Sequence, residues 1–265
     1  MPIFHRYIAL GDSMTEGMCD EIVGGNYRGW ADRIADEFAI DNPHFTYLNL
    51  AIRGKLLGQV IDDQIPIAKK FIEGPQTLVS FHAGANDVLR PNYRPEVTFD
   101  LYRKGATELA QTGATLVLFT VIEKATGKGK TAELWETRFK DFNNNVRKVA
   151  SDLGAILIEW NEAMFLSDRR FLAPDRLHLN AEGHHRVAQG VLEKLNMSFD
   201  SQWKMPLPPA RDTSKIADLI DDAKWLYSFA LPWVWRRVRG KSSGDGRESK
   251  HYEPVKWSDF RSFRQ

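Results

Sequence analysis

Arg6-Tyr7-Ile8-Ala9-Leu10 is an apolar run, and Gly11-Asp12-Ser13-Met14-Thr15-Glu16-Gly17 follows it directly. The first run is typical of a buried strand. The glycine, aspartate and serine that follow are residues of turns and helix N-caps. The stretch therefore predicts a strand that turns sharply into a helix, with Ser13 at the carboxyl end of the strand. Ligands bind at such ends in open α/β sheets.

Four more apolar or β-branched runs predict strands, at residues 45–50, 77–81, 115–122 and 155–160. Segments with helical spacing lie between them, and a last helix is expected at 181–195. Alternating strands and helices indicate right-handed βαβ units and a parallel sheet with helices on both faces. We expect a three-layer α/β/α fold in residues 1–200, with a flavodoxin-like five-stranded parallel sheet of order 2-1-3-4-5. Residues 201–265 are expected to form a helical and extended tail.

Composition excludes several function classes. The 36 basic and 35 acidic residues nearly cancel, so we expect a small-molecule substrate and no nucleic-acid partner. Cys19 is the single cysteine, and no Cys/His cluster has zinc-ligand spacing, so neither a metal nor a cofactor is expected. No stretch resembles a signal peptide or a membrane span, which indicates a cytoplasmic protein.

The tail differs from the rest of the chain. It begins with a proline-rich linker at 205–209 and has 13 basic against 8 acidic residues. A helical apolar stripe spans 216–230, and Trp233, Trp235 and three arginines follow it. We expect the stripe to pack on the domain itself or on a second subunit. A membrane surface is the alternative, because interfacial aromatics beside cations suit anionic headgroups. The oligomeric state is left open.

Two further strand-end loops contain hydrogen-bond donors. Gly54 follows the second strand, and Asn86 follows the third. A glycine amide and an Asn side-chain amide are donors of the kind that an oxyanion hole requires. In the expected strand order the two loops would flank Ser13. Taken singly, Gly54 is also explained by a positive φ angle and Asn86 by an Asx turn.

Asp175 and His178 lie in the segment before the last helix. A carboxylate three residues before a histidine can hold one imidazole nitrogen and leave the other free to accept a proton from a serine. Ser13, His178 and Asp175 are therefore predicted to form a nucleophile, a general base and an orienting group.

These motifs resemble, in the same order along the chain, those of the SGNH hydrolases, also called the GDSL esterase/lipase family. The matching motifs are Gly11-Asp12-Ser13, Thr15 with Gly17, Gly54, Gly84 with Asn86-Asp87, and Asp175 with His178. The resemblance implies Ser13 as nucleophile, His178 as base and Asp175 as orienter. It also implies an oxyanion hole formed by the amides of Ser13 and Gly54 and the side chain of Asn86. Arg176 departs from the family pattern, because many members carry glycine after the aspartate.

The expected activity is that of a serine esterase with an acyl-Ser13 intermediate. Carbohydrate O-acetyl esters, lysophospholipids and short-chain carboxylic esters all remain candidate substrates. The alternative is a catalytically idle scaffold that binds a membrane surface or a partner through its basic tail.

Three other patterns could indicate a phosphate-binding loop, a metal site or a functional histidine, but we interpret each of them as structural. Residues 127–131 contain Gly-Lys-Thr but lack the first glycine of a phosphate-binding loop. His184 and His185 are adjacent and diverge on a helix, so they cannot share a metal, and we expect both on the helix surface. His82 is expected to be a buried, hydrogen-bonded histidine.

Overall fold

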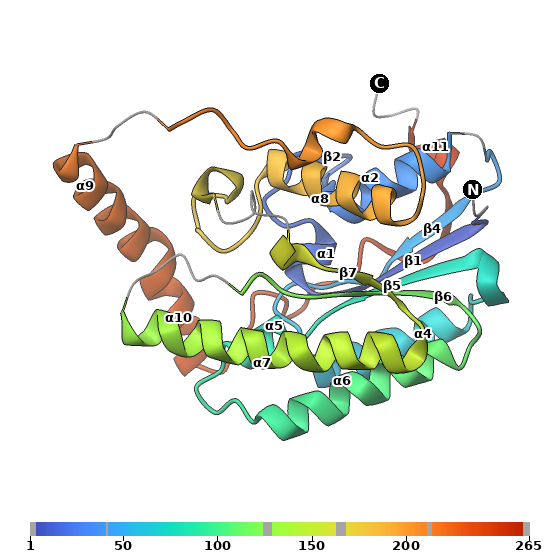
Figure 1. The fold of residues 1–265 in the computed structure, drawn as a ribbon, viewed down its shortest axis with the longest axis horizontal. Helices are drawn as coiled ribbons and strands as arrows, with labels where there is room; N and C mark the ends of the chain where they lie inside the picture. Colours follow the sequence, from blue (N-terminus) through green and yellow to red (C-terminus); the bar gives the residue numbers. More distant parts are fainter. Residues whose placement is uncertain (1–3, 41, 124–128, 163–167, 211–213, 262–265) are drawn as a thin grey trace.

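The computed structural model describes residues 4–40, 42–123, 129–162, 168–210 and 214–261. Within these ranges, a six-stranded sheet forms the centre of the molecule (Figure 1). Its strands are, in order across the sheet, β7 (Ile156–Ile158), β6 (Thr115–Phe119), β5 (Thr77–His82), β1 (Arg6–Gly11), β4 (Thr46–Asn49) and β8 (His251–Lys256). The first five are parallel, and β1 pairs with β4 and β5 through Ile8 opposite Leu48 and Val79. This confirms the predicted order of the parallel strands.

The sixth strand corrects the prediction of a five-stranded sheet. β8 comes from the tail and pairs antiparallel with β4, with Val255 opposite Tyr47. Its sequence has no alternation of apolar and polar residues and contains Pro254, which is tolerated on an edge strand. The strand therefore gives no local signal, and its position depends on a partner about 200 residues earlier in the chain.

Two helical layers cover the sheet (Figure 1). One contains α2 (Gly29–Phe38), α8 (Ala181–Lys194) and α11 (Trp257–Arg261), and the other contains α3 (Leu57–Gln59), α4 (Ile65–Lys69), α6 (Pro95–Ala110) and α7 (Lys130–Leu153). Short elements complete the described part of the body: α1 (Ser13–Glu16), α5 (Ala85–Val88), a hairpin of β2 (Ile22–Val23) and β3 (Asn26–Tyr27), and 3₁₀ turns at 74–76, 160–162, 169–171 and 201–204. A π-helical turn at Val60–Gln64 joins α3 to α4.

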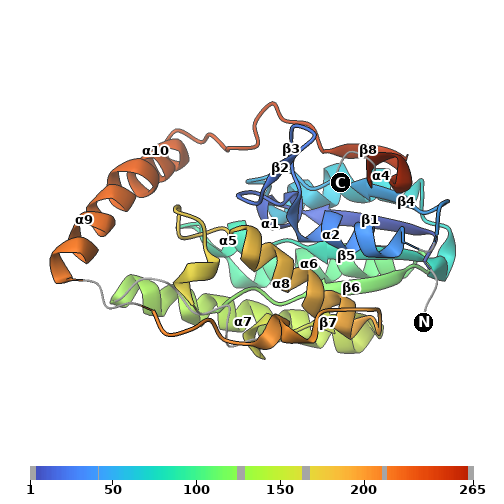
Figure 2. The same cartoon turned by 90° about the horizontal axis from the view of Figure 1, so that it is seen from above.

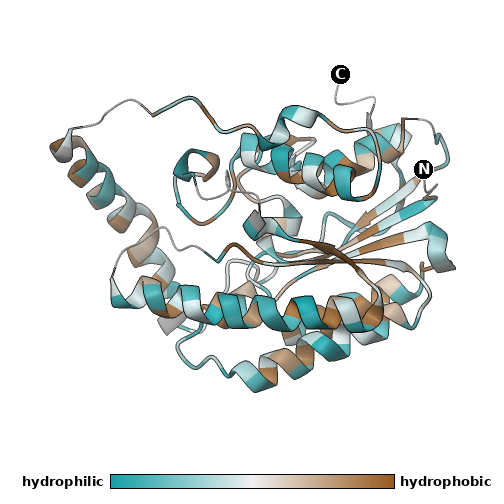
Figure 3. Ribbon diagram, viewed as in Figure 1, coloured by the Kyte–Doolittle hydropathy of each residue, from teal (hydrophilic) through white to brown (hydrophobic). Residues whose placement is uncertain are grey.

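The core lies on both faces of the sheet. All six residues of β5 are buried, as expected for a parallel strand that is covered on both sides. Figure 3 shows hydrophobic strands between helices whose outer faces are hydrophilic. The two layers enclose separate apolar clusters, one around Trp30 and Phe119 and the other around Phe81 and Phe142. A sheet packed in this way holds its strand-end loops in fixed positions.

Part of the tail forms an arm outside these layers. It consists of α9 (Lys215–Trp225), a π-helical turn (Leu226–Ala230) and α10 (Leu231–Val238), which Figure 2 shows standing away from the body. The stripe does not pack on the domain, because Ile216 and Leu219 are 71% and 68% exposed, and the expected alternative of packing on a second subunit stays a prediction. Among the described helices, none combines the length and the hydrophobicity needed to cross a membrane. A domain boundary at residue 200 stays a prediction.

Candidate active site

Ser13 begins helix α1 directly after strand β1. The side chain of Asp12 accepts a hydrogen bond of 3.3 Å from the amide of Met14 and so caps the helix. Gly17 ends the helix with φ at 89°, and a Cβ there would lie 2.4 Å from the Cα of Gly29. This close approach requires glycine at position 17. It fixes the turn that places Ser13, which is only 9% exposed, at the strand end.

His178 lies in a loop that folds back before helix α8. The amide of Ala173 donates to the carbonyl of His178 at 2.8 Å, and Leu172 pairs with Leu179 in a β-bridge. These bonds fix the loop against the carboxyl end of the sheet. His178 Nε2 then lies 2.9 Å from Ser13 Oγ. The structure thus brings together two residues that are 165 positions apart.

Asp175 faces the other imidazole nitrogen. His178 Nδ1 lies 2.6 Å from Asp175 Oδ2, and the amides of Leu177 and His178 both donate to Asp175 Oδ1 at 3.0 Å. Burial raises the pKa of Asp175, but the hydrogen bonds and charge of His178 outweigh it, so the net pKa is below its usual range. Because Asp175 is ionised, Nδ1 carries the proton and Nε2 can accept one from Ser13.

Asn86 is linked to Ser13 through the neighbouring residue. Its Nδ2 donates to Asp12 Oδ2 at 3.1 Å and to the carbonyl of Lys55 at 3.2 Å. Burial raises the pKa of Asp12 to about 6, although hydrogen bonds from Met14 and Asn86 oppose this rise. The Asn86 amide is therefore held between the Ser13 turn and the loop that contains Gly54.

Gly54 has φ at 74°, a conformation that favours glycine. Its loop is anchored by an ion pair between Arg53 and Glu16, in which the amide of Arg53 also donates to Glu16 at 2.6 Å. Glu16 belongs to α1, so this pair ties the Gly54 loop to the helix that Ser13 begins. This pair has no local signal in the sequence, because Arg53 and Glu16 meet only through the order of the strands.

A known protein family matches most of this chain. The sequence profile of the GDSL-like lipase/acylhydrolase family matches residues 9–186. The chain belongs to this family. It is therefore a carboxylic ester hydrolase, as the sequence motifs predicted. No match is found among curated proteins.

Solved structures of GDSL-like and other esterases share the fold. An acetylxylan esterase from Geobacillus stearothermophilus has 17% identity and a TM-score of 0.58, and the match covers 76% of this chain and 100% of the esterase. A lipolytic G-D-S-L family protein from Veillonella parvula has 19% identity and a TM-score of 0.57, over 71% of this chain and 96% of that protein. A psychrotrophic esterase from Pseudoalteromonas, inhibited by monoethylphosphonate, has 14% identity and a TM-score of 0.57. The match covers 72% of this chain and 97% of that esterase.

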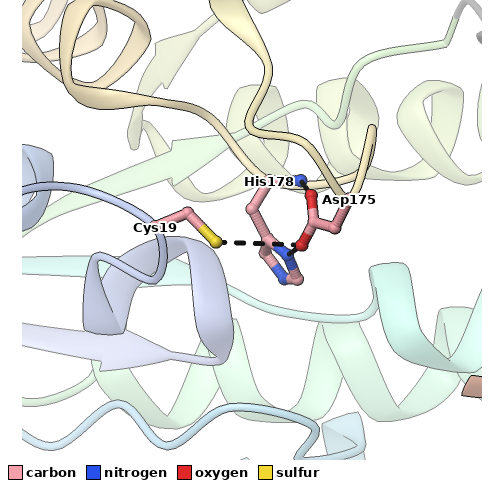
Figure 4. Close-up of side chains that lie close together, drawn as sticks. All are labelled: Cys19, Asp175 and His178. Atoms are coloured by element: carbon pink, nitrogen blue, oxygen red, sulfur yellow. Dashed lines mark hydrogen bonds and ion pairs between the residues drawn. The ribbon is translucent and has the colours of Figure 1, made fainter. Parts of the chain in front are cut away.

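Cys19 lies next to two residues of this hydrolase site that could ligate a metal. Figure 4 shows its thiol beside Asp175 and His178, and Sγ lies 3.8 Å from Asp175 Oδ2. In the described part of the chain these three side chains offer ligand atoms within 4.8 Å of one another. Burial and the charge of Asp175 raise the pKa of the Cys19 thiol to about 12, so it is protonated at neutral pH. Asp175 and His178 already bind each other, and a metal there would compete with that bond.

Two histidines near the site of this GDSL-like enzyme are buried. His82 ends β5, and burial lowers its pKa to about 4; its Nδ1 has no hydrogen-bond partner in the described structure. It is buried as predicted, but that nitrogen is not hydrogen-bonded. The prediction that His184 lies on the helix surface was wrong, because its side chain is fully buried in α8. Its Nε2 donates to the carbonyl of Met18 at 3.1 Å and supports the loop beside Cys19.

Contacts from the tail reach both sides of the site, and no sequence motif of the family predicted them. Trp225 Nε1 donates to the carbonyl of Asp175 at 2.9 Å. Ser242 Oγ donates to the carbonyl of Gly54 at 3.1 Å. Arg176 has φ at 59°, a conformation that suits the glycine of other family members, and its guanidinium lies 5.0 Å from the Trp225 ring. The departure from the family pattern thus coincides with the attachment of the tail.

Proposed function

We propose that this hydrolase cleaves carboxylic esters through an acyl-Ser13 intermediate, with His178 as general base and Asp175 as its orienting group. One observation carries the proposal: a continuous hydrogen-bonded chain runs from Ser13 Oγ through His178 to the carboxylate of Asp175. This is the arrangement that activates a serine hydroxyl for attack on a carbonyl.

The mechanism uses these groups in two stages. Ser13 Oγ attacks the ester carbonyl carbon while His178 Nε2 takes its proton, and the collapsing tetrahedral intermediate expels the alcohol, which takes that proton. A water molecule then gives a proton to His178 and attacks the acyl carbon. Breakdown of the second intermediate releases the acid and returns the proton to Ser13. Asp175 stays ionised and stabilises the imidazolium in both stages.

In this proposal, the oxyanion is bound by the backbone amides of Ser13 and Gly54 and by the side-chain amide of Asn86. None of the three donors can lose its proton near neutral pH. Asn86 Nδ2 donates to Asp12 and to the carbonyl of Lys55, which holds the amide in place before substrate binds. The oxyanion would replace one of these two acceptors, because the amide has only two N–H donors. The proposal requires no metal and no cofactor.

The substrate is proposed to be a small acyl or acetyl ester or a lipid-like ester. The acetylxylan esterase of similar fold supports the inclusion of acetylated sugars. A panel of p-nitrophenyl esters of increasing acyl length, measured beside acetylated xylo-oligosaccharides, would rank these classes by kcat/KM.

The roles of Ser13 and His178 are tested by Ser13→Ala, His178→Ala and the double variant on p-nitrophenyl acetate. Each single variant should lose about 10⁴-fold or more in kcat, and the double variant should be no slower, because the residues act as a unit. Ser258→Ala, on α11, is the control and should retain full activity. The proposal would be contradicted if the fold-loss of the double variant equalled the product of the two single losses, or if the Ser13→Ala enzyme were active.

A further inference from the structure

The arm formed by residues 215–241 exposes an unusual amount of apolar side chain. Eight large hydrophobic residues on it are each at least two-fifths exposed: Ile216, Leu219, Ile220, Leu226, Tyr227, Leu231, Val234 and Trp235. Burying one such side chain stabilises a protein or complex by about 1.5 to 3 kcal/mol. A contiguous surface of this kind marks an interaction site.

The charges of the arm are divided along its length. Residues 226–241 contain four basic residues and no acidic residue. The acidic Asp221 and Asp222 lie in α9 and pair with Arg176 of the body at 2.9 and 2.7 Å. Two of the three acidic residues of the arm are thus paired with the body, while residues 226–241, which include α10, contain only positive charge. Its partner is therefore expected to be negatively charged.

Trp235 and Arg239 form a pair at the end of α10. The guanidinium of Arg239 lies 4.3 Å from the centroid of the Trp235 ring, and both side chains are exposed. An amphipathic aromatic ring beside a cation suits the boundary between headgroups and acyl chains of a lipid bilayer. A second copy of the chain is a poorer partner, because two identical faces would bring eight positive charges together.

The arm is attached to both loops of the catalytic site. Trp225 at the end of α9 bonds to the carbonyl of Asp175, and Ser242 just beyond α10 bonds to the carbonyl of Gly54. Figure 2 shows α9 and α10 along the side of the molecule at which the parallel strands end. A surface bound by the arm would therefore lie beside the catalytic serine.

We propose that the arm docks on an anionic lipid surface and that the enzyme takes its ester substrate from that surface. The inference that the arm docks is drawn from the arm alone, whereas the inference about the substrate rests on the proposed function. The helices would lie in the interface with their apolar side chains among the acyl chains, because neither is long enough to span a bilayer. Docking would thus present lipid-borne esters to Ser13.

The docking is tested by sedimentation of the full chain with vesicles. One set contains phosphatidylcholine alone, and the other contains equal parts of phosphatidylcholine and phosphatidylglycerol. The wild type should bind the anionic vesicles and bind the neutral vesicles far more weakly. The variant Arg236→Gln/Arg239→Gln should bind anionic vesicles about thirtyfold more weakly, because each cation near such a surface contributes about fivefold. The variant Leu231→Asn/Trp235→Asn should lose at least about tenfold on both vesicle types.

Matched controls separate docking from general effects. Arg103→Gln and Ile40→Asn remove an exposed cation and an exposed apolar residue elsewhere, and neither should change binding. All variants should hydrolyse soluble p-nitrophenyl acetate like the wild type. The two arm variants should hydrolyse a long-chain p-nitrophenyl ester embedded in anionic vesicles at least about tenfold more slowly, in proportion to their lost binding.

Three results would overturn the inference: no binding of the wild type to anionic vesicles, binding unchanged in both arm variants, or a dimer of the wild type that the arm variants dissociate. The last result would assign the arm to an interface between copies. If the wild type binds vesicles but hydrolyses neither ester, docking stands and the proposed function fails. If it hydrolyses the soluble ester without binding vesicles, the proposed function stands and docking fails.

Discussion

The side-chain amide of Asn86 donates a 3.1 Å hydrogen bond to Asp12, the residue that directly precedes Ser13. The bond links the loop after β5 to the loop after β1. It holds the amide near Ser13 before any substrate is present, which is the condition for an efficient oxyanion donor.

Asn86→Ala should therefore lower kcat by about 10²- to 10³-fold and leave KM almost unchanged, because the amide would bind the transition state more strongly than the ester. Steady-state kinetics on p-nitrophenyl acetate measure both constants. Asn42→Ala, at the opposite end of the strands, is the control. If Asn86→Ala changed KM alone, Asn86 would be a substrate-binding residue and not an oxyanion donor.

Asp12 predicts a pH dependence of stability. Burial raises the pKa of Asp12 to about 6 in the folded protein, whereas an unfolded aspartate has a pKa of about 4. Between these values the folded protein still holds a proton that the unfolded chain has released, so raising the pH lowers the free energy of unfolding. The total loss is on the order of 3 kcal/mol.

Asp12→Asn removes the titrating group, so its stability relative to the wild type should increase as the pH rises from about 4 to about 6. Urea denaturation across this window measures the difference. The lost hydrogen bond shifts the variant by a constant amount, and only the slope with pH is diagnostic. A difference that does not vary with pH would show that Asp12 does not titrate in this window.

Trp257 predicts how strongly the end of the chain is held on the body. Its side chain is fully buried, and its Nε1 donates to Asp36 at 2.9 Å. Trp257→Ala should lower the free energy of unfolding by about 3 to 5 kcal/mol, measured by urea denaturation. Tyr252→Ala, on β8 and 60% exposed, should change it by less than about 0.5 kcal/mol. Equal effects of the two variants would mean that β8 and α11 do not pack on the body in solution.

Much of the site could be predicted because its signals are local. Ser13 follows an apolar strand, and Asp175 precedes His178 by three residues, so both arrangements can be read from short stretches. The strand order then follows from alternating strands and helices, and it places the Gly54 and Asn86 loops on either side of β1.

The remaining features depend on contacts between distant segments. Strand β8 has no apolar periodicity, and only its pairing with β4 defines it. Nothing in the sequence around Trp225 indicates a contact with the site, yet its indole donates to the carbonyl of Asp175. His184 looked like a surface residue because its neighbours in sequence are polar, whereas the loop containing Met18 covers it. Sequence periodicity reports which side of a helix is apolar, but not which segment will pack on it.

The central claim, that Ser13 is the nucleophile, is tested most directly by labelling with a fluorophosphonate. Intact mass spectrometry should show one phosphonyl group on the wild type, and peptide mapping should place it on Ser13. Ser13→Ala should remain unlabelled, His178→Ala should react far more slowly, and Ser258→Ala should be labelled like the wild type. Labelling of Ser13→Ala to the same extent as the wild type, or a wild-type protein that does not react, would contradict the assignment of Ser13.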